Sequence, residues 1–327
     1  MADTVQEQIN QYIEDTIGAE RNFEKALSTF GKTGEQTPVQ ALLSSASAKA
    51  KTQHERLEAL LKSRGGTPSE GKTILAEMLA FTPLSAQIGQ GAAEKNTQHL
   101  MVTFAAAAAE MAMYESLATA GAEGGAADVV SLARTLQGEE RDDYDQVWAI
   151  LKTSAADSFQ AELDKGTSSQ DILIRYLEDA IAAEKSFESQ LLGFSKEVED
   201  ATVQALFQQH ADETREQYTL LTQRLEELGG STSAVKGFLA QMFGMAPKIA
   251  QIGHDKYERQ TQDLMMAYAV ENAEVAMYES LAQAAHLAGD THTEQLARQI
   301  QHQEKQTAEK VWAQVAPEAR RAMQAVL

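Results

Sequence analysis

The sequence contains no cysteine among its 327 residues. This absence excludes disulfide bonds, thiolate nucleophiles and zinc sites that use thiolate ligands. No apolar run approaches the roughly 20 residues of a membrane-spanning helix, and the first residues lack the basic and apolar segments of a secretory signal. We therefore expect a soluble cytoplasmic protein without a membrane partner.

Basic residues are also in short supply, because 28 Lys and Arg face 48 Asp and Glu. The resulting net charge of −20 repels nucleic acid and anionic lipid, so we expect no nucleic-acid partner. Proline is rare, with 5 residues, which leaves long stretches where helices can run without interruption. Hydrophobic residues make up 43% of the chain, enough for a packed core, and its length favours two domains.

The chain repeats itself. Residues 105–118 read AAAAAEMAMYESLA, and residues 269–282 read AVENAEVAMYESLA. The same step of 164 residues separates Glu110 from Glu274 and Glu140 from Glu304, so the two copies align without a net insertion. A constant offset over this span indicates an internal duplication. We predict two domains, residues 1–155 and residues 166–327, joined by a polar connector at 153–170.

Each copy is expected to be entirely helical, because β-branched runs with a period of two are missing. The helices are predicted at about 4–30, 37–64, 92–121 and 125–152, and again at 169–193, 200–228, 255–288 and 290–315. A long connector, which carries a short amphipathic stretch, separates the second and third helices of each copy. Two helical hairpins joined by one long crossover are typical of the ferritin-like bundle. The predicted fold class is therefore all-α, with two tandem ferritin-like four-helix bundles.

Every helix of the second copy places glutamate among its apolar residues. These glutamates are Glu184, Glu213, Glu271, Glu274 and Glu304. An isolated ionised carboxylate is strongly disfavoured in a core, so such acids either hold protons or bind cations. Two divalent ions would neutralise them, and carboxylates with His210 close by favour iron or manganese over zinc. No organic cofactor is expected. Glutamate is also a strong helix former, so an acid at the edge of an apolar stripe is the simpler alternative for each position.

The first copy carries a weaker version of this pattern. Its candidate ligands are Glu20, Glu110, Glu140 and Asp143. Lys49 stands where the second copy has Glu213, and Ala107 stands where it has Glu271. Because Lys49 could pair with Glu20 or Glu110, we interpret this site as degenerate: it is either converted to an internal salt bridge or a weak site for one metal ion.

With these residues in view, the second copy resembles the YciE/YciF-type ferritin-like proteins of bacteria. The segments that carry the resemblance are AEKSFE at 183–188, HADET at 210–214, RLEELGG at 224–230, VENAEVAMY at 270–278 and HQEK at 302–305. The resemblance implies a two-metal carboxylate site in a stress-related bundle, with ligands at Glu184, Glu213, Glu271 or Glu274, and Glu304. The E-x-x-H motif of the wider di-iron class is absent, since Glu216 follows Glu213 and Thr307 follows Glu304 at that spacing.

Two functions remain open from the sequence. The first is a ferritin-like metal-binding protein, a di-iron or di-manganese stress protein that acts on Fe(II), oxygen or peroxide. The alternative is a non-enzymatic scaffold, a helical bundle that self-assembles into a homo-oligomer through its connectors and binds no metal.

Overall fold

A computed structural model describes residues 4–32, 37–68, 91–232 and 256–326 of the chain. The residues in these ranges form helices and turns, with no β-strand. The helices are α1 (Val5–Phe30), α2 (Pro38–Ser63), α4 (Ala92–Glu123), α5 (Ala127–Asp164), α6 (Ser169–Glu197), α7 (Ala201–Glu227), α9 (Lys256–Ala288) and α10 (Thr291–Gln324). The predicted all-α class is confirmed.

Local sequence signals explain where several helices begin and end. Before α2, the Thr37 side chain accepts a hydrogen bond from the Gln40 amide and the Gln40 side chain bonds back to Thr37, with Pro38 at the first helical position. Helices α2 and α7 are each followed by a glycine with positive φ, Gly65 at 79° and Gly229 at 81°. Helices commonly end at a residue in the left-handed conformation, and glycine adopts it at little cost because it has no Cβ atom.

Each copy folds into a four-helix bundle whose second and third helices run parallel. At one end of the first bundle, Arg64 at the end of α2 pairs with Asp128 at the start of α5, 3.0 Å away. At the other end, Gln40 and Asn96, near the starts of α2 and α4, lie 3.4 Å apart. Helices α2 and α4 therefore point the same way, as the predicted long crossover requires. The connecting residues 69–90 and 233–255, including their amphipathic stretches, lie outside the described residues.

The fourth helix of each copy is longer than the sequence predicted. Helix α5 continues to Asp164, so most of the expected polar connector is helical and the expected domain end at residue 155 falls inside α5. The buried residues Ser154, Ala155, Ser158 and Phe159 recur at helical spacing along this extension and hold it against the neighbouring helices. Helix α10 likewise runs to Gln324 and contains Pro317, where one backbone hydrogen bond is lost.

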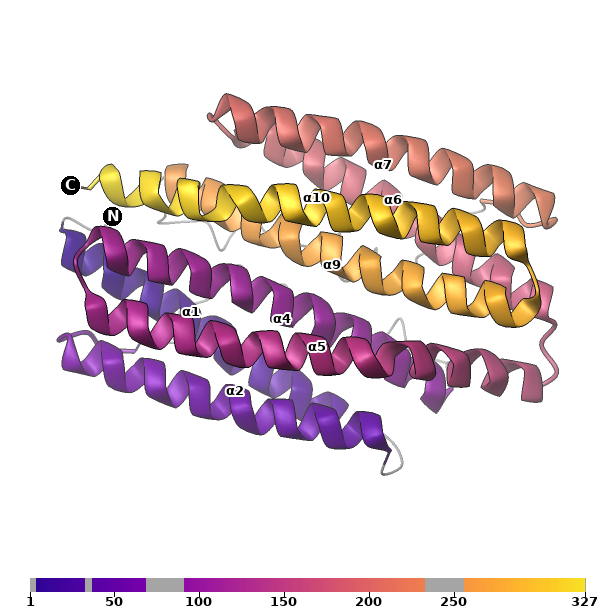
Figure 1. Ribbon diagram of the computed structural model, residues 1–327, viewed down its shortest axis with the longest axis horizontal. Coiled ribbons are helices and arrows are strands. Elements are labelled where there is room, and N and C mark those ends of the chain that lie inside the picture. The colour runs from indigo at the N-terminus through magenta and orange to yellow at the C-terminus, as the bar shows by residue number, and fades with distance from the viewer. Residues whose placement is uncertain (1–3, 33–36, 69–90, 233–255, 327) are drawn as a thin grey trace.

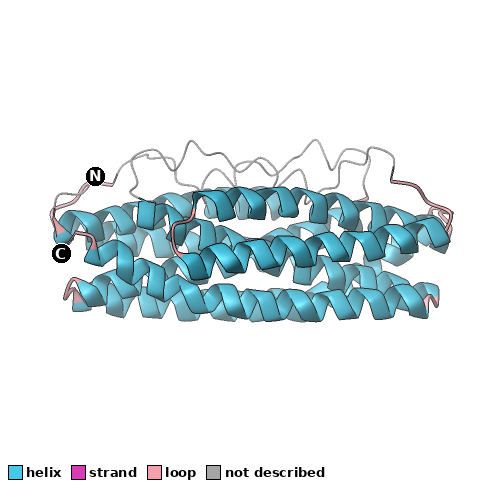
Figure 2. Ribbon diagram, turned by 90° about the horizontal axis from the view of Figure 1, so that it is seen from above, coloured by secondary structure: helices cyan, strands magenta, loops and turns pink. Residues whose placement is uncertain are grey.

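The two bundles pack side by side through α4 and α9, the third helix of each copy (Figure 1). Both helices are buried on all faces over most of their length, so neither shows an amphipathic stripe. Between the bundles, the Tyr144 hydroxyl of α5 donates a hydrogen bond to Asn272 of α9 over 2.7 Å. Figure 2 shows that the helices run along the long axis of the molecule and lie in layers one above another.

The helices of the described ranges lack the long uninterrupted apolar stretch that crossing a lipid bilayer requires.

Candidate metal centres

The second bundle brings four candidate ligands together at its centre. His210 extends from α7, Glu271 and Glu274 from α9, and Glu304 from α10. Each residue offers one ligand atom such that all these atoms lie within 4.8 Å of one another. None of the four side chains is more than 2% exposed, so the group is sealed from solvent.

Glu184 of α6 adjoins this group from the fourth side. The Glu184 side chain is fully buried, and its Oε1 accepts a hydrogen bond from the hydroxyl of Tyr278. Burial raises the pKa of Glu184 well above its usual value, and the charge of Glu304 adds to the shift. The tyrosine therefore fixes the orientation of one carboxylate at the edge of the centre.

Glu213, predicted as a ligand, lies outside the group. Its carboxylate accepts hydrogen bonds from Gln209 at 2.8 Å and from Thr307 at 3.5 Å. The buried face of α7 instead passes through His210, Thr214 and Gln217. Gln217 donates from Nε2 to Glu304 Oε1 over 2.5 Å, so an amide that the sequence analysis overlooked orients one of the central carboxylates.

The first bundle holds a corresponding group of three acids. Ligand atoms of Glu20, Glu110 and Glu140 lie within 4.8 Å of one another, and none of these residues is more than 1% exposed. Their orienting groups repeat those of the second bundle. The Tyr114 hydroxyl donates to Glu20, and Gln53 donates to Glu140 Oε1 over 2.6 Å.

Lys49 does not pair with Glu20 or Glu110, contrary to the expectation from the sequence. Its ammonium group binds Asp143 and lies 3.4 Å from the backbone carbonyl of Glu139. Asp143 is thus engaged in an ion pair beside the centre and stands outside the group of three. Lys49 and Asp143 occupy the repeat positions of Glu213 and Thr307. In each copy, these two positions form a contact between the second and the fourth helix.

Within the two groups of ligands, the copies differ by a pair of residues. Glu271 and His210 of the second bundle replace Ala107 and Ala46 of the first. His210 Nδ1 lies 2.8 Å from Glu271 Oε1, and His210 Nε2 lies 3.5 Å from Glu304 Oε2. The extra acid therefore arrives with an imidazole. Aligning the two copies at position 46 would have revealed this partner, because alanine and histidine differ so sharply in chemistry.

The electrostatics of both groups are those of buried acids crowded together. Burial raises the pKa of Glu110 and of Glu274 well above the usual range, and the neighbouring carboxylates raise both further. The pKa of Glu140 and that of Glu271 rise to about 7, chiefly through burial. Burial alone would lower the pKa of His210, but Glu271 and Glu304 raise it well above its usual value.

Several buried polar atoms in these groups have no hydrogen-bond partner. Among the described residues, neither oxygen of Glu110 nor of Glu274 has a hydrogen-bond partner. The ring nitrogens of His210 have only their ion-pair contacts with Glu271 and Glu304. Buried polar groups in folded proteins are otherwise nearly always paired. Carboxylate oxygens and imidazole nitrogens that converge in this way match the donor set of a ferritin-like metal centre.

Comparison with known families decides the relationship. The sequence profile of a family described as "Domain of unknown function (DUF892)" matches residues 4–159 and again residues 168–324. The chain belongs to the DUF892 family. It therefore carries two tandem copies of the family's ferritin-like domain, one for each bundle. The chain is also similar to a solved protein from Xanthomonas campestris pv. campestris, with 26% identity, over 48% of this chain and 98% of that one, at a TM-score of 0.42.

Proposed function

We propose that this chain binds divalent metal ions in two buried carboxylate centres, and that the centre of the second bundle is the stronger one. The observation that supports the proposal most directly is that the buried oxygens of Glu110 and Glu274 have no hydrogen-bond partner among the described residues. Leaving such groups buried and unpaired costs free energy, and a bound cation removes that cost.

The number of acids suggests how many ions each centre holds. Four carboxylates, from Glu184, Glu271, Glu274 and Glu304, balance the charge of two divalent ions in the second bundle, with His210 as a neutral ligand once bound. The three acids of the first bundle provide one carboxylate fewer than two divalent ions require for neutrality. We therefore propose about two ions in the second bundle and about one in the first.

The ligand chemistry favours iron or manganese. Oxygen-rich sites suit manganese and Fe(II), and a single imidazole among carboxylates suits iron. Such ions would supply redox chemistry toward Fe(II), oxygen or peroxide, as in a stress-related redox protein. The chain contributes a site buried away from solvent and carboxylates of fixed orientation: Tyr278 holds Glu184, and Gln217 holds Glu304.

Elemental analysis of metal per chain tests the proposal. The protein is loaded anaerobically with Fe(II) or Mn(II), desalted and compared with the Glu304→Ala and Glu140→Ala variants. Glu304→Ala should remove about two ions and Glu140→Ala about one. Glu213→Ala serves as the matched control, because Glu213 lies outside the group and its loss should leave the metal content unchanged.

Absence of retained metal in the parent protein would overturn the proposal. The carboxylates would then be protonated core residues, and the chain would be the non-enzymatic, self-assembling scaffold that the sequence left open. Loss of metal in Glu213→Ala would show that the centre is built differently from the arrangement described above.

A further inference from the structure

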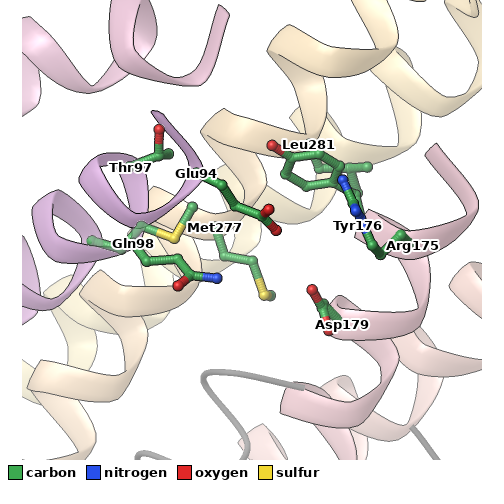
Figure 3. A pocket seen from close by; sticks show the side chains of 9 residues that line it. Glu94, Thr97, Gln98, Arg175, Tyr176, Asp179, Met277 and Leu281 are labelled. Carbon is green, nitrogen blue, oxygen red and sulfur yellow. The ribbon is translucent and has the colours of Figure 1, made fainter. Parts of the chain in front are cut away.

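A small pocket lies at the seam between the bundles, where α4, α6 and α9 meet (Figure 3). Its polar lining comes from Glu94 and Gln98 of α4 and from Arg175 and Asp179 of α6, and Met101 and Met277 contribute apolar walls. The inner volume is about 40 Å³, which has room for about three water molecules. None of these residues belongs to the carboxylate centres.

Two acids of the pocket, Glu94 and Asp179, receive no hydrogen bond from the part of the chain that the structure describes. The one cationic residue of the lining, Arg175, binds Glu162 over 3.2 Å, and Glu162 also binds Lys165 over 2.5 Å. Three acids thus share two basic side chains, which leaves one negative charge without a counterpart.

A buried amide also faces this space. Gln98 is 7% exposed, and its side chain points into the pocket in Figure 3. The Gln98 Oε1 atom is buried and has no hydrogen-bond partner in the part of the chain that the structure describes. Such an orphaned group is unusual in a folded protein, so it supports the presence of a polar ligand at this place.

The internal repeat provides a comparison within the same molecule. Glu258 of α9 corresponds to Glu94, and at that position Gln8 of α1 donates a hydrogen bond to the carboxylate. In the other copy, Ile172 occupies the position of Gln8 and has no polar group to donate. Glu258 therefore receives a hydrogen bond from Gln8, whereas Glu94 receives none from any residue in the described ranges.

The charge state of Asp179 fits the same picture. Burial and the negative charge of Glu94 together raise the pKa of Asp179 to about 7, in spite of the opposing charge of Arg175. A cation bound between the two carboxylates would favour their ionised forms. Because apolar walls surround the acids, an organic cation fits this space better than a hydrated metal ion does.

We propose that this pocket binds the ammonium group of a small primary aliphatic amine. The ammonium group donates hydrogen bonds to the carboxylates of Glu94 and Asp179 and to the amide oxygen of Gln98. The first carbons of the amine lie against Met101 and Met277. The site is separate from the metal centres, so it is independent of the proposed metal function.

Isothermal titration calorimetry of the full chain with n-butylamine tests this inference, with n-butanol as the uncharged probe of similar shape. We expect saturable binding of the amine, at least tenfold tighter than any binding of the alcohol. Asp179→Asn should weaken amine binding at least tenfold, and thermal melts should show that this variant is folded. Asp15→Asn, at the corresponding place on α1, is the matched control and should leave the affinity unchanged.

Three results would overturn the proposal. Equal binding of amine and alcohol would show that the acids do not select a cation. Equal affinity in Asp179→Asn and the parent would place any amine elsewhere on the protein. Tighter binding of Mn²⁺ or Mg²⁺ than of butylamine, lost in Asp179→Asn, would identify the pocket as a metal site.

Discussion

Replacing Glu274 by glutamine should stabilise the metal-free protein. Glu274 is fully buried, and neither of its carboxylate oxygens has a hydrogen-bond partner. Burial and the charges of Glu184 and Glu304 raise the pKa of Glu274 well above its usual range. Without a metal ion, folding at neutral pH therefore requires Glu274 to take up a proton. Glutamine has nearly the same shape and needs none.

The size of the effect follows from proton linkage. A glutamate in the unfolded chain has a pKa of about 4.3, so protonating it at pH 7 costs about 2.7 units, or about 4 kcal/mol. This value is a ceiling, because the neighbouring acids share protons. An acid whose pKa is raised by folding destabilises the fold above its unfolded pKa and has no effect below it. The advantage of Glu274→Gln should therefore shrink toward zero as the pH falls to about 4.

Urea denaturation followed by circular dichroism measures this effect in the presence of a chelator at pH 7 and pH 4.5. With Mn²⁺ at 100 times its dissociation constant, the parent protein should gain about 2.7 kcal/mol, which the variant loses. A Glu274→Gln variant that is no more stable than the parent at pH 7, or whose advantage is independent of pH, would refute the reasoning.

Glu279, five residues further along α9, provides the opposite control. Burial alone would raise the pKa of Glu279. Hydrogen bonds from Arg298 and Gln301 nevertheless hold this pKa below its usual range. Glu279→Gln should therefore destabilise the protein at pH 7, by about 1–3 kcal/mol. A change of the same sign in both variants would show that glutamine acts through packing and not through charge.

Three further predictions concern other parts of the chain. Ala46→His combined with Ala107→Glu gives the first bundle the ligands of the second, and elemental analysis should find about one more ion per chain; an unchanged content would contradict the assigned role of this pair. Tyr278→Phe removes the hydrogen bond to Glu184 and should weaken metal binding about tenfold in a chelator competition. Asp179→Asn should stabilise the fold by about 1–2 kcal/mol above pH 7, where the aspartate of the parent is ionised; this value allows for the partial exposure of the side chain. The gain in stability should vanish below about pH 4.

The helical architecture could be predicted because its signals are local. The Thr37–Gln40 capping box and the glycines at 65 and 229 mark helix ends in the sequence itself. The extension of α5 was missed because TSAADSFQAELD is polar and resembles a linker. The small residues Ser154 and Ser158 are buried there by neighbouring helices, which the local sequence does not reveal.

The choice of ligands depended on helix rotation, which the sequence fixes less well. Successive helical residues differ by about 100° in direction, so Glu213 and Thr214 face different neighbours. The structure turns Thr214 inward and leaves Glu213 at the edge of α7. The fully buried helices α4 and α9 posed a harder problem, because no apolar stripe shows which side faces the centre and which faces the other bundle.

The seam between α4 and α9 joins two similar units through one covalent chain. In a symmetric dimer of separate subunits, every substitution appears twice, once on each side of the axis. Here the partner of Tyr144 is Asn272, whereas the positions related to them by the repeat hold Ala308 and Ala108, so that contact exists once. A tethered pair can therefore specialise each half on its own, and dilution cannot separate the halves.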